Sequence, residues 1–157
     1  MTTPAAGESW AGPGSVAWKI NQEVVLLLGW GRAILLQFAH PLVAAGVAEH
    51  SLFLNHPRGR WRRLRHTVEA MLALTFGTPA EVARAAGAIN AIHDRVNGTL
   101  PAPVGPFRSG QHYSAHDPEL LRWVHATLLD TFPLIYERFV GPLSAAEKDR
   151  YCAEASG

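Results

Sequence analysis

Apolar residues recur along most of this chain at steps of three and four, the spacing that places them on one face of an α-helix. The first such run predicts a helix over 15–28 and consists of Val16, Ile20, Val24 and Leu27. Ser15 is of the type that caps a helix N-terminus by accepting a backbone hydrogen bond. Gly29 and Gly31 interrupt the run, so a second, short helix is expected over 32–40.

Proline and glycine mark the ends of the next helices, which are expected over 42–54, 59–76 and 79–97. Pro41 disfavours the helical conformation at His40 and suits the first turn of the helix that follows. Thr78, Pro79 and Glu81 supply a capping residue, a proline at the first helical position and an acid in the first turn. The helix over 79–97 therefore has the stronger start signal.

The segment 99–116 is rich in proline and glycine and has no periodicity, which indicates a long loop. A further helix is expected over 117–140, with a kink near Pro133. Ser144 and Glu147 form a capping-box pattern that opens a last helix. No stretch alternates between apolar and polar residues for long enough to predict a sheet, so the expected fold class is all-α.

Composition supports one domain with about six to seven helices over 15–157, after a flexible tail over 1–14 that is rich in Gly, Pro and Ala. Hydrophobic residues make up 48% of the 157 residues and charged residues 17%, which excludes intrinsic disorder. The formal net charge of +1 is too balanced for a dedicated nucleic-acid-binding protein. Arginines cluster only locally, over 58–65.

The single cysteine, Cys152, forms no intrachain disulfide, and 1–14 lacks the pattern of a secretory signal. Both features predict a reducing, cytoplasmic location. The most apolar stretch, 24–48, is interrupted by polar residues and lacks the roughly 20 uninterrupted apolar residues of a spanning helix. It is therefore interpreted as buried helical core, with a peripheral membrane contact left open.

Two of the eight histidines lie in apolar stripes by helical projection. One stripe contains His93 and consists of Val82, Ala86, Ile89, His93 and Val96. The other contains His125 and consists of Leu121, His125, Leu128 and Phe132. An inward histidine most often bonds a backbone carbonyl, and less often binds a ligand. Projection alone does not choose between the two.

Arg63 lies one turn before Thr67 on the expected helix over 59–76, so both point the same way at the edge of its apolar stripe. The guanidinium either pairs with Glu49 or Asp94, or extends into solvent. Alternatively, it grips a carboxylate or phosphate of a ligand, with Thr67 donating a hydrogen bond. The HExxH, GxSxG and glycine-rich phosphate-loop patterns are absent.

Several ordered motifs carry a resemblance that spans Ser15 to the C-terminus. They are GRAILLQFAHPLVAAGVAEHS at 31–51, RLRHT at 63–67, FG at 76–77, HDRVNG at 93–98 and YSAHDPELLRWVHAT at 113–127. In this order the motifs resemble the catalytic-domain family of the bacterial oxygenase MpaB and rubber oxygenase (latex-clearing protein), formerly a domain of unknown function. The resemblance implies an all-helical domain that holds a b-type haem.

Matched by motif, His93 is the axial ligand of the haem iron, which resolves the choice between His93 and His125. The resemblance places Arg63 and Thr67 in the lining of the site, where they orient a haem propionate, dioxygen or the distal water network. It also implies a place for His66 on the distal side. These roles predict a haem b-dependent oxygenase-like protein, an oxidoreductase that uses dioxygen on an apolar, isoprenoid or unsaturated substrate.

Other residues receive supporting roles in this hypothesis. Glu49, taken as pointing inward with Leu42 and Phe53, is either a buried partner of Arg63 or a catalytic base. The loop 99–116 would shape the entrance to the site. The histidines outside the ligand motif, His40 and His125, are expected to satisfy backbone carbonyls or support neighbouring helices.

The second hypothesis comes from another class. Members of the family continue through further helices beyond the position of Gly157, so the chain matches the N-terminal part of the family domain. It would then be a truncated, non-catalytic helical protein that binds an apolar ligand or a partner subunit. An exposed apolar face predicts marginal stability or self-association into a homo-oligomer.

Overall fold

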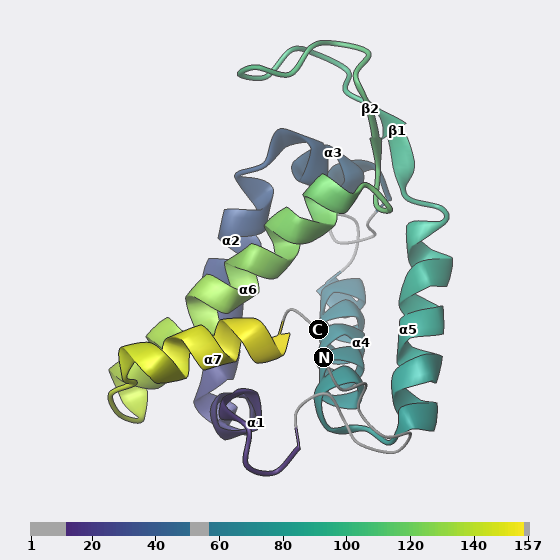
Figure 1. The fold of residues 1–157 in the computed structure, drawn as a ribbon. Helices are drawn as coiled ribbons and strands as arrows, with labels where there is room; N and C mark the ends of the chain where they lie inside the picture. The colour runs from purple at the N-terminus through teal and green to yellow at the C-terminus, as the bar shows by residue number, and fades with distance from the viewer. Residues whose placement is uncertain (1–11, 51–56, 156–157) are drawn as a thin grey trace.

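The computed structural model describes residues 12–50 and 57–155, with the side chains of 57–64 excepted. In chain order the elements are α1 (Val16–Asn21), the 3₁₀ helix η1 (Val24–Gly29), α2 (Trp30–Phe38), α3 (Pro41–His50), α4 (Pro57–Phe76), α5 (Pro79–His93), β1 (Asn97–Thr99), β2 (His112–Ser114), α6 (Pro118–Phe139) and α7 (Ala145–Ala155) (Figure 1). The all-α prediction is confirmed, since the described residues form seven α-helices and one sheet of two short strands.

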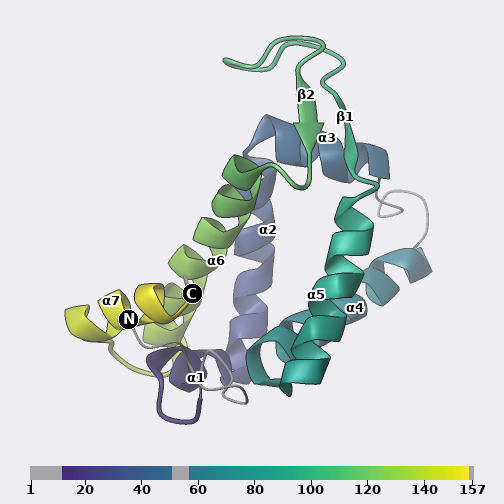
Figure 2. The same ribbon diagram turned by 45° about the vertical axis from the view of Figure 1, so that its right-hand side comes forward.

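The helices form two groups that the hairpin β1–β2 and α3 join at one end (Figure 2). In the first group, η1 and α2 lie along α6, while α1 and α7 pack together at the far end of α6. The second group is the pair α4 and α5. The edge-to-face contact of Trp18 with Phe76, at 4.8 Å between ring centroids, links α1 to α4.

Two clusters of buried side chains form the core. The larger joins α1, η1, α6 and α7, and its buried members are Val16, Ala17, Ile20, Leu26, Phe132, Tyr136, Leu143 and Tyr151. The smaller lies where α3, the hairpin and the start of α6 meet, and consists of Leu42, Leu100, Tyr113 and Leu120. Because α6 contributes to both clusters, it fixes the position of the hairpin relative to α1 and α7.

The expected helix over 15–28 is wrong in one respect: it breaks after Asn21 and continues as η1. Ser15 does cap α1, accepting a hydrogen bond from the Trp18 amide at 3.0 Å. No break occurs at Gly29, because the chain passes directly into α2. Gly29 is instead a contact point, since a Cβ atom there would lie 2.8 Å from Cγ1 of Ile135 on α6.

The expected loop over 99–116 contains secondary structure that periodicity missed. Thr99 pairs with His112, and Asn97 pairs with Ser114, in an antiparallel hairpin. Strands of three residues are too short to show an alternating pattern. The pairing also ends α5 at His93, four residues before the expected end of this helix.

Both predicted helix starts with strong local signals are confirmed. The Thr78 and Ser144 amides donate to Glu81 and Glu147 respectively, each at 2.8 Å. The reciprocal bonds from the glutamate amides to the two hydroxyls complete each capping box. α3 is described as far as His50, so the expected extension of this helix to residue 54 lies outside the described residues.

We predict opposite effects for alanine at two helical glycines. Gly29→Ala places a methyl group against Ile135 and Thr131, and this overpacking lowers the free energy of unfolding by about 1–3 kcal/mol. Gly87→Ala on α5 meets nothing within 4 Å and raises the free energy of unfolding by about 0.5–1 kcal/mol through helix propensity. Urea unfolding followed by circular dichroism measures both, and equal changes would contradict the assigned contact.

Candidate functional site

His93 is the last residue of α5 and lies half-buried on its inner stripe. The predicted inward face is confirmed, since the other members of the stripe, Val82, Ala86, Ile89 and Val96, are also half-buried. No residue of α5 is fully buried. Burial lowers the pKa of the His93 imidazole below 6.5, and His116 lowers it further. The neutral imidazole is therefore the dominant form near neutral pH.

A second histidine stands beside His93. The rings of His93 and His116 meet edge to face, with centroids 5.7 Å apart and planes at 81°. Nε2 of His116 lies 2.8 Å from Oδ1 of Asp94, which holds this second ring. No described residue hydrogen-bonds the ring nitrogens of His93. The result is an anchored imidazole next to one whose nitrogens have no partner within the described part of the chain.

Glu49 is not inward beside Leu42, as the sequence suggested, because Leu42 is buried while Glu49 is largely exposed at the end of α3. Its carboxylate oxygen Oε2 instead accepts a hydrogen bond from the hydroxyl of Tyr113 at 2.5 Å. Tyr113 is 1% exposed, and its burial together with the Glu49 carboxylate raises the pKa of the phenol to about 12.

Close packing around Tyr113 explains why glycine occupies two nearby positions. A Cβ atom on Gly98 would lie 2.6 Å from the Tyr113 hydroxyl and 2.9 Å from Oε2 of Glu49. A Cβ atom on Gly46 would meet Cγ1 of Val96 at 3.3 Å. The hairpin therefore docks on α3 through a contact that leaves no room for side chains at either glycine.

The hairpin also connects this contact to the histidine pair. The Ala115 amide donates to the carbonyl of Val96 at 2.8 Å, at the point where the two chain segments leave the strands. Nε2 of His50 lies 3.0 Å from the carbonyl oxygen of Asn97 on β1. The ends of α3 and α5 thus meet at one hairpin, which carries Tyr113 on β2 and His116 just beyond it.

The residues predicted on the fourth helix lie on α4, which packs against α5. Thr67 and His66 are both exposed. The side chain of Arg63 lies outside the described residues, so its predicted direction stays a prediction. The structure therefore brings the helix of Arg63 and Thr67 next to the helix of His93.

The predicted stripe through His125 is wrong for its first two members, because Leu121 and His125 are exposed, whereas Leu128 and Phe132 do belong to the larger core cluster. The buried face of α6 includes Thr127 and Thr131, whose hydroxyls accept hydrogen bonds from Gln37 and Arg32 of α2. Apolar periodicity counts these threonines as polar, so it predicts a buried face of α6 that is turned away from the observed one. The expected carbonyl contact is present, since Nε2 of His125 lies 2.9 Å from the Ala155 oxygen.

His40 does not follow the expected carbonyl role at Nδ1. This atom is buried and has no hydrogen-bond partner within the described part of the chain. The His40 ring instead lies against aromatic rings, 5.1 Å from that of Phe107 and 5.8 Å from that of Trp123, measured between centroids. It supports the junction of α2 and α3.

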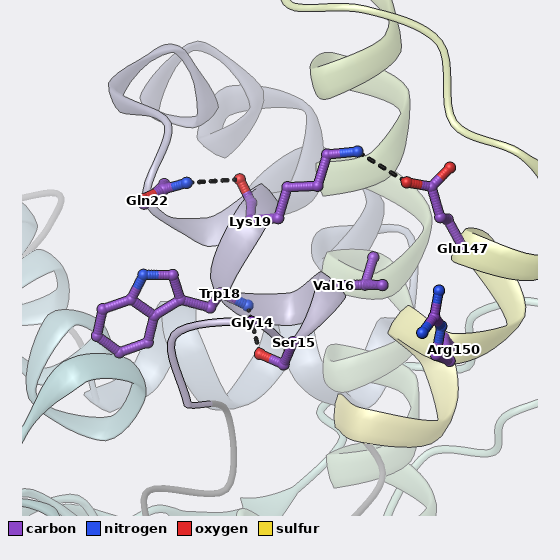
Figure 3. Close-up of a pocket in the computed structure, with 8 residues that line it drawn as sticks. All are labelled: Gly14, Ser15, Val16, Trp18, Lys19, Gln22, Glu147 and Arg150. Carbon is purple, nitrogen blue, oxygen red and sulfur yellow. Dashed lines mark hydrogen bonds and ion pairs between the residues drawn. The ribbon is translucent and has the colours of Figure 1, made fainter.

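A polar cavity of about 390 Å³ opens beside α1 and α7 (Figure 3). Lys19 and Glu147 form an ion pair of 2.7 Å on its wall. The lining residues are Gly14, Ser15, Val16, Trp18, Lys19, Gln22, Glu147 and Arg150. None of the predicted site residues borders this cavity.

Within 12–50 and 57–155, no three His, Cys, Asp or Glu side chains lie close enough to hold a metal ion together. No single helix in the same ranges has the length and hydropathy to cross a membrane, although Val24–Phe38 and Pro41–His50, bent by 107°, meet those limits together.

Comparison with protein families matches residues 18–156 to the catalytic domain described as ER-bound oxygenase mpaB/B'/Rubber oxygenase. The chain belongs to this family. The resemblance seen in its motifs is thereby confirmed, and the match makes the chain part of an oxygenase catalytic-domain family.

Two relatives of this family member are uncharacterized proteins of Mycobacterium bovis and Mycobacterium tuberculosis. Each is 32% identical over 126 residues, which cover 78% of this chain and 46% of the relative. The chain therefore spans about half the length of the curated relatives it matches. No solved structure matches it significantly.

The sequence patterns did not predict the contacts that Tyr113, His116 and Asp94 make in the structure. Tyr113 and His116 both stand in the quoted segment 113–127, and Asp94 directly follows His93 in the quoted segment 93–98. Their residue types were visible, but no helical period connects a loop residue with a helix end. The hairpin register places Tyr113 opposite Gly98, and Nε2 of His116 lies 2.8 Å from Oδ1 of Asp94 beyond the ends of the strands.

We predict that Glu49→Gln lowers the pKa of Tyr113 from about 12 towards 10.0, because the carboxylate no longer favours the protonated phenol. Burial keeps the value above 10.0. Since the folded pKa is raised, this contact stabilises the fold below pH 10 and the contribution is lost as the pH rises towards 12. NMR titration of ¹³C-labelled tyrosine measures the pKa, with Glu69→Gln on α4 as the control. An unchanged Tyr113 titration in Glu49→Gln would contradict the pairing.

Proposed function

We propose that this protein is a haem b-dependent oxygenase that uses dioxygen on an apolar, isoprenoid or other unsaturated, substrate, with His93 as the axial ligand of the iron. The chain belongs to an oxygenase catalytic-domain family. The observation that carries the proposal is the environment of His93 within it. Its imidazole is half-buried, has a lowered pKa and has no hydrogen-bond partner among the described residues.

These properties are those required of an axial histidine, which must be neutral and present a bare ring nitrogen to the metal. Haem iron needs only one such protein ligand. A cluster of three metal-ligating side chains, which the described ranges lack, is therefore not required. When haem is bound, its iron supplies the chemistry by which dioxygen is activated.

The neighbours of His93 position its ring in this proposal. His116 is held by Asp94 and packs edge-on against His93, which limits rotation of the imidazole. Arg63 and Thr67 on the adjacent helix α4 bind a carboxylate of the cofactor, with the guanidinium as a bidentate donor. His66, next to Thr67, is assigned to the distal side of the same site.

Glu49 is the proposed catalytic base. The hydroxyl of Tyr113 fixes its Oε2, which leaves Oε1 to accept a proton from the substrate. The apolar character of the substrate is inferred from the stripe of α5 that leads to His93, which includes Val82 and Ile89. We place the protein in the reducing cytoplasm, because its sequence contains a single cysteine.

A non-catalytic helical protein that binds an apolar ligand or a partner subunit is the second candidate. It is favoured by the incomplete burial of α5, on which no residue is fully buried. The two candidates differ in colour. A Soret band in the purified or hemin-reconstituted chain supports the oxygenase, and a colourless chain that takes up no hemin supports the second candidate.

We predict that His93→Ala abolishes hemin binding, while His125→Ala retains it. His125 is exposed and bonds only a carbonyl near the end of α7, so its removal changes stability by less than about 1 kcal/mol. Hemin titration followed at the Soret band measures both variants, and circular dichroism confirms that they fold. Loss of hemin binding in His125→Ala but not in His93→Ala would overturn the assignment.

We also predict that Arg63→Ala raises the dissociation constant for hemin about tenfold, through loss of a charge-assisted hydrogen bond. Arg65→Ala is the matched control on the same helix, because Arg65 is exposed and pairs with Glu69 at 2.8 Å. Its dissociation constant is expected to stay unchanged. Equal effects of both substitutions would indicate a general basic surface.

A further inference from the structure

A stripe of exposed apolar side chains runs along η1 and α2. The exposed fractions are 79% for Val24, 50% for Leu27, 66% for Leu28, 36% for Ile34, 72% for Leu35 and 37% for Phe38. Exposed Gly31 lies between Leu28 and Ile34. Contiguous apolar surface of this kind on a folded domain marks an interaction site.

The opposite face of the same segment is buried against α6 through Leu26, Gly29 and Ala33. The segment therefore carries apolar residues on its exposed face as well as on the face that packs against α6. Its one charged side chain, Arg32, is neutralised by Asp130 of its own chain at 2.7 Å. A partner on the exposed stripe meets no unpaired charge from this segment.

The stripe is symmetric about Gly31. Val24 and Phe38 lie seven residues to either side, Leu27 and Leu35 lie four, and Leu28 and Ile34 lie three. Two copies of the stripe, packed antiparallel about a two-fold axis at Gly31, bring the apolar side chains of η1 in one copy onto those of α2 in the other. A self-complementary surface is what an isologous dimer requires.

We propose that two copies of this chain associate through the stripe of η1 and α2, antiparallel, with Gly31 at the crossing point. A Cβ atom on Gly31 would have nothing within 4 Å in one copy, so the space beside its backbone is open to the second. The absence of a side chain there allows the two backbones to approach closely.

The available area suits such a dimer. The six exposed side chains offer on the order of 500 Å² per copy, so the pair buries about 1,000 Å² in total, the size of a weak or transient interface. Two copies of the stripe also bring no like charges together, because its members are all uncharged.

Cysteine cross-linking tests the two-fold axis in the full chain with Cys152 replaced by serine. Gly31→Cys places a thiol on the axis, next to its own copy, and is expected to form a disulfide-linked dimer at least tenfold faster than Gly87→Cys. Gly87 is the matched control, since it is an exposed helical glycine that also has nothing within 4 Å. Equal rates for the two variants would overturn the proposal.

A charge exchange tests the register by sedimentation equilibrium. Leu35→Glu sets a carboxylate against Leu27 of the second copy and is expected to weaken the dimer at least tenfold. Adding Leu27→Lys in the same chain creates two Lys–Glu pairs across the axis and restores dimerisation. Leu72→Glu on α4 is the control at a similarly exposed leucine, and it leaves the wild-type association unchanged.

Each alternative outcome is decisive. A wild-type chain that is monomeric at all concentrations overturns the proposal, as does a double variant that stays as weak as Leu35→Glu. Flotation with phosphatidylcholine vesicles distinguishes a lipid surface. A wild-type chain that floats without dimerising, and that loses this property in both charged variants, assigns the stripe to a membrane instead.

Discussion

The packing of η1 and α2 on α6 is the constraint on which the rest of the molecule depends. Gly29 sits so close to Ile135 and Thr131 that a methyl group has no space, and Arg32 donates to the Thr131 hydroxyl at 2.7 Å. These contacts fix which face of α6 is buried. Since α6 runs from the smaller core cluster at Leu120 to the larger one at Tyr136, its rotation positions both clusters at once.

The hairpin transmits this arrangement to the candidate site. Its three-residue strands contribute little buried area of their own, yet Tyr113 on β2 is among the most buried side chains of the described chain. Tyr113 holds Glu49 at the end of α3, and the loop that follows β2 holds His116 beside His93 at the end of α5. Two helix ends that share no sequence neighbourhood are thus placed by one pair of strands.

Part of the chain's high apolar content lies on the surface of the folded protein. With 48% hydrophobic residues, the chain buries one face of the segment from η1 through α2 and leaves the other in contact with solvent. The α4–α5 pair is similarly shallow, because no residue of α5 is fully buried. Burial of about 25 cal/mol per Å² makes such surface a source of binding free energy. The proposed association and the proposed ligand binding both depend on these surfaces.

The sequence by itself determined the all-α class, the helix starts at Ser15, Thr78 and Ser144, the inner stripe of α5 with His93, and membership of the oxygenase catalytic-domain family. Capping bonds and helical periods act over three or four residues, so local sequence records them. Only the tertiary structure decided the break between α1 and η1, the buried face of α6, and the pairing of Tyr113 with Glu49. These depend on contacts between segments far apart in the sequence, such as that of Arg32 with Thr131 across 99 residues, which leave no local pattern. The sequence does not distinguish a buried threonine that accepts a hydrogen bond from a distant guanidinium from a threonine exposed to solvent.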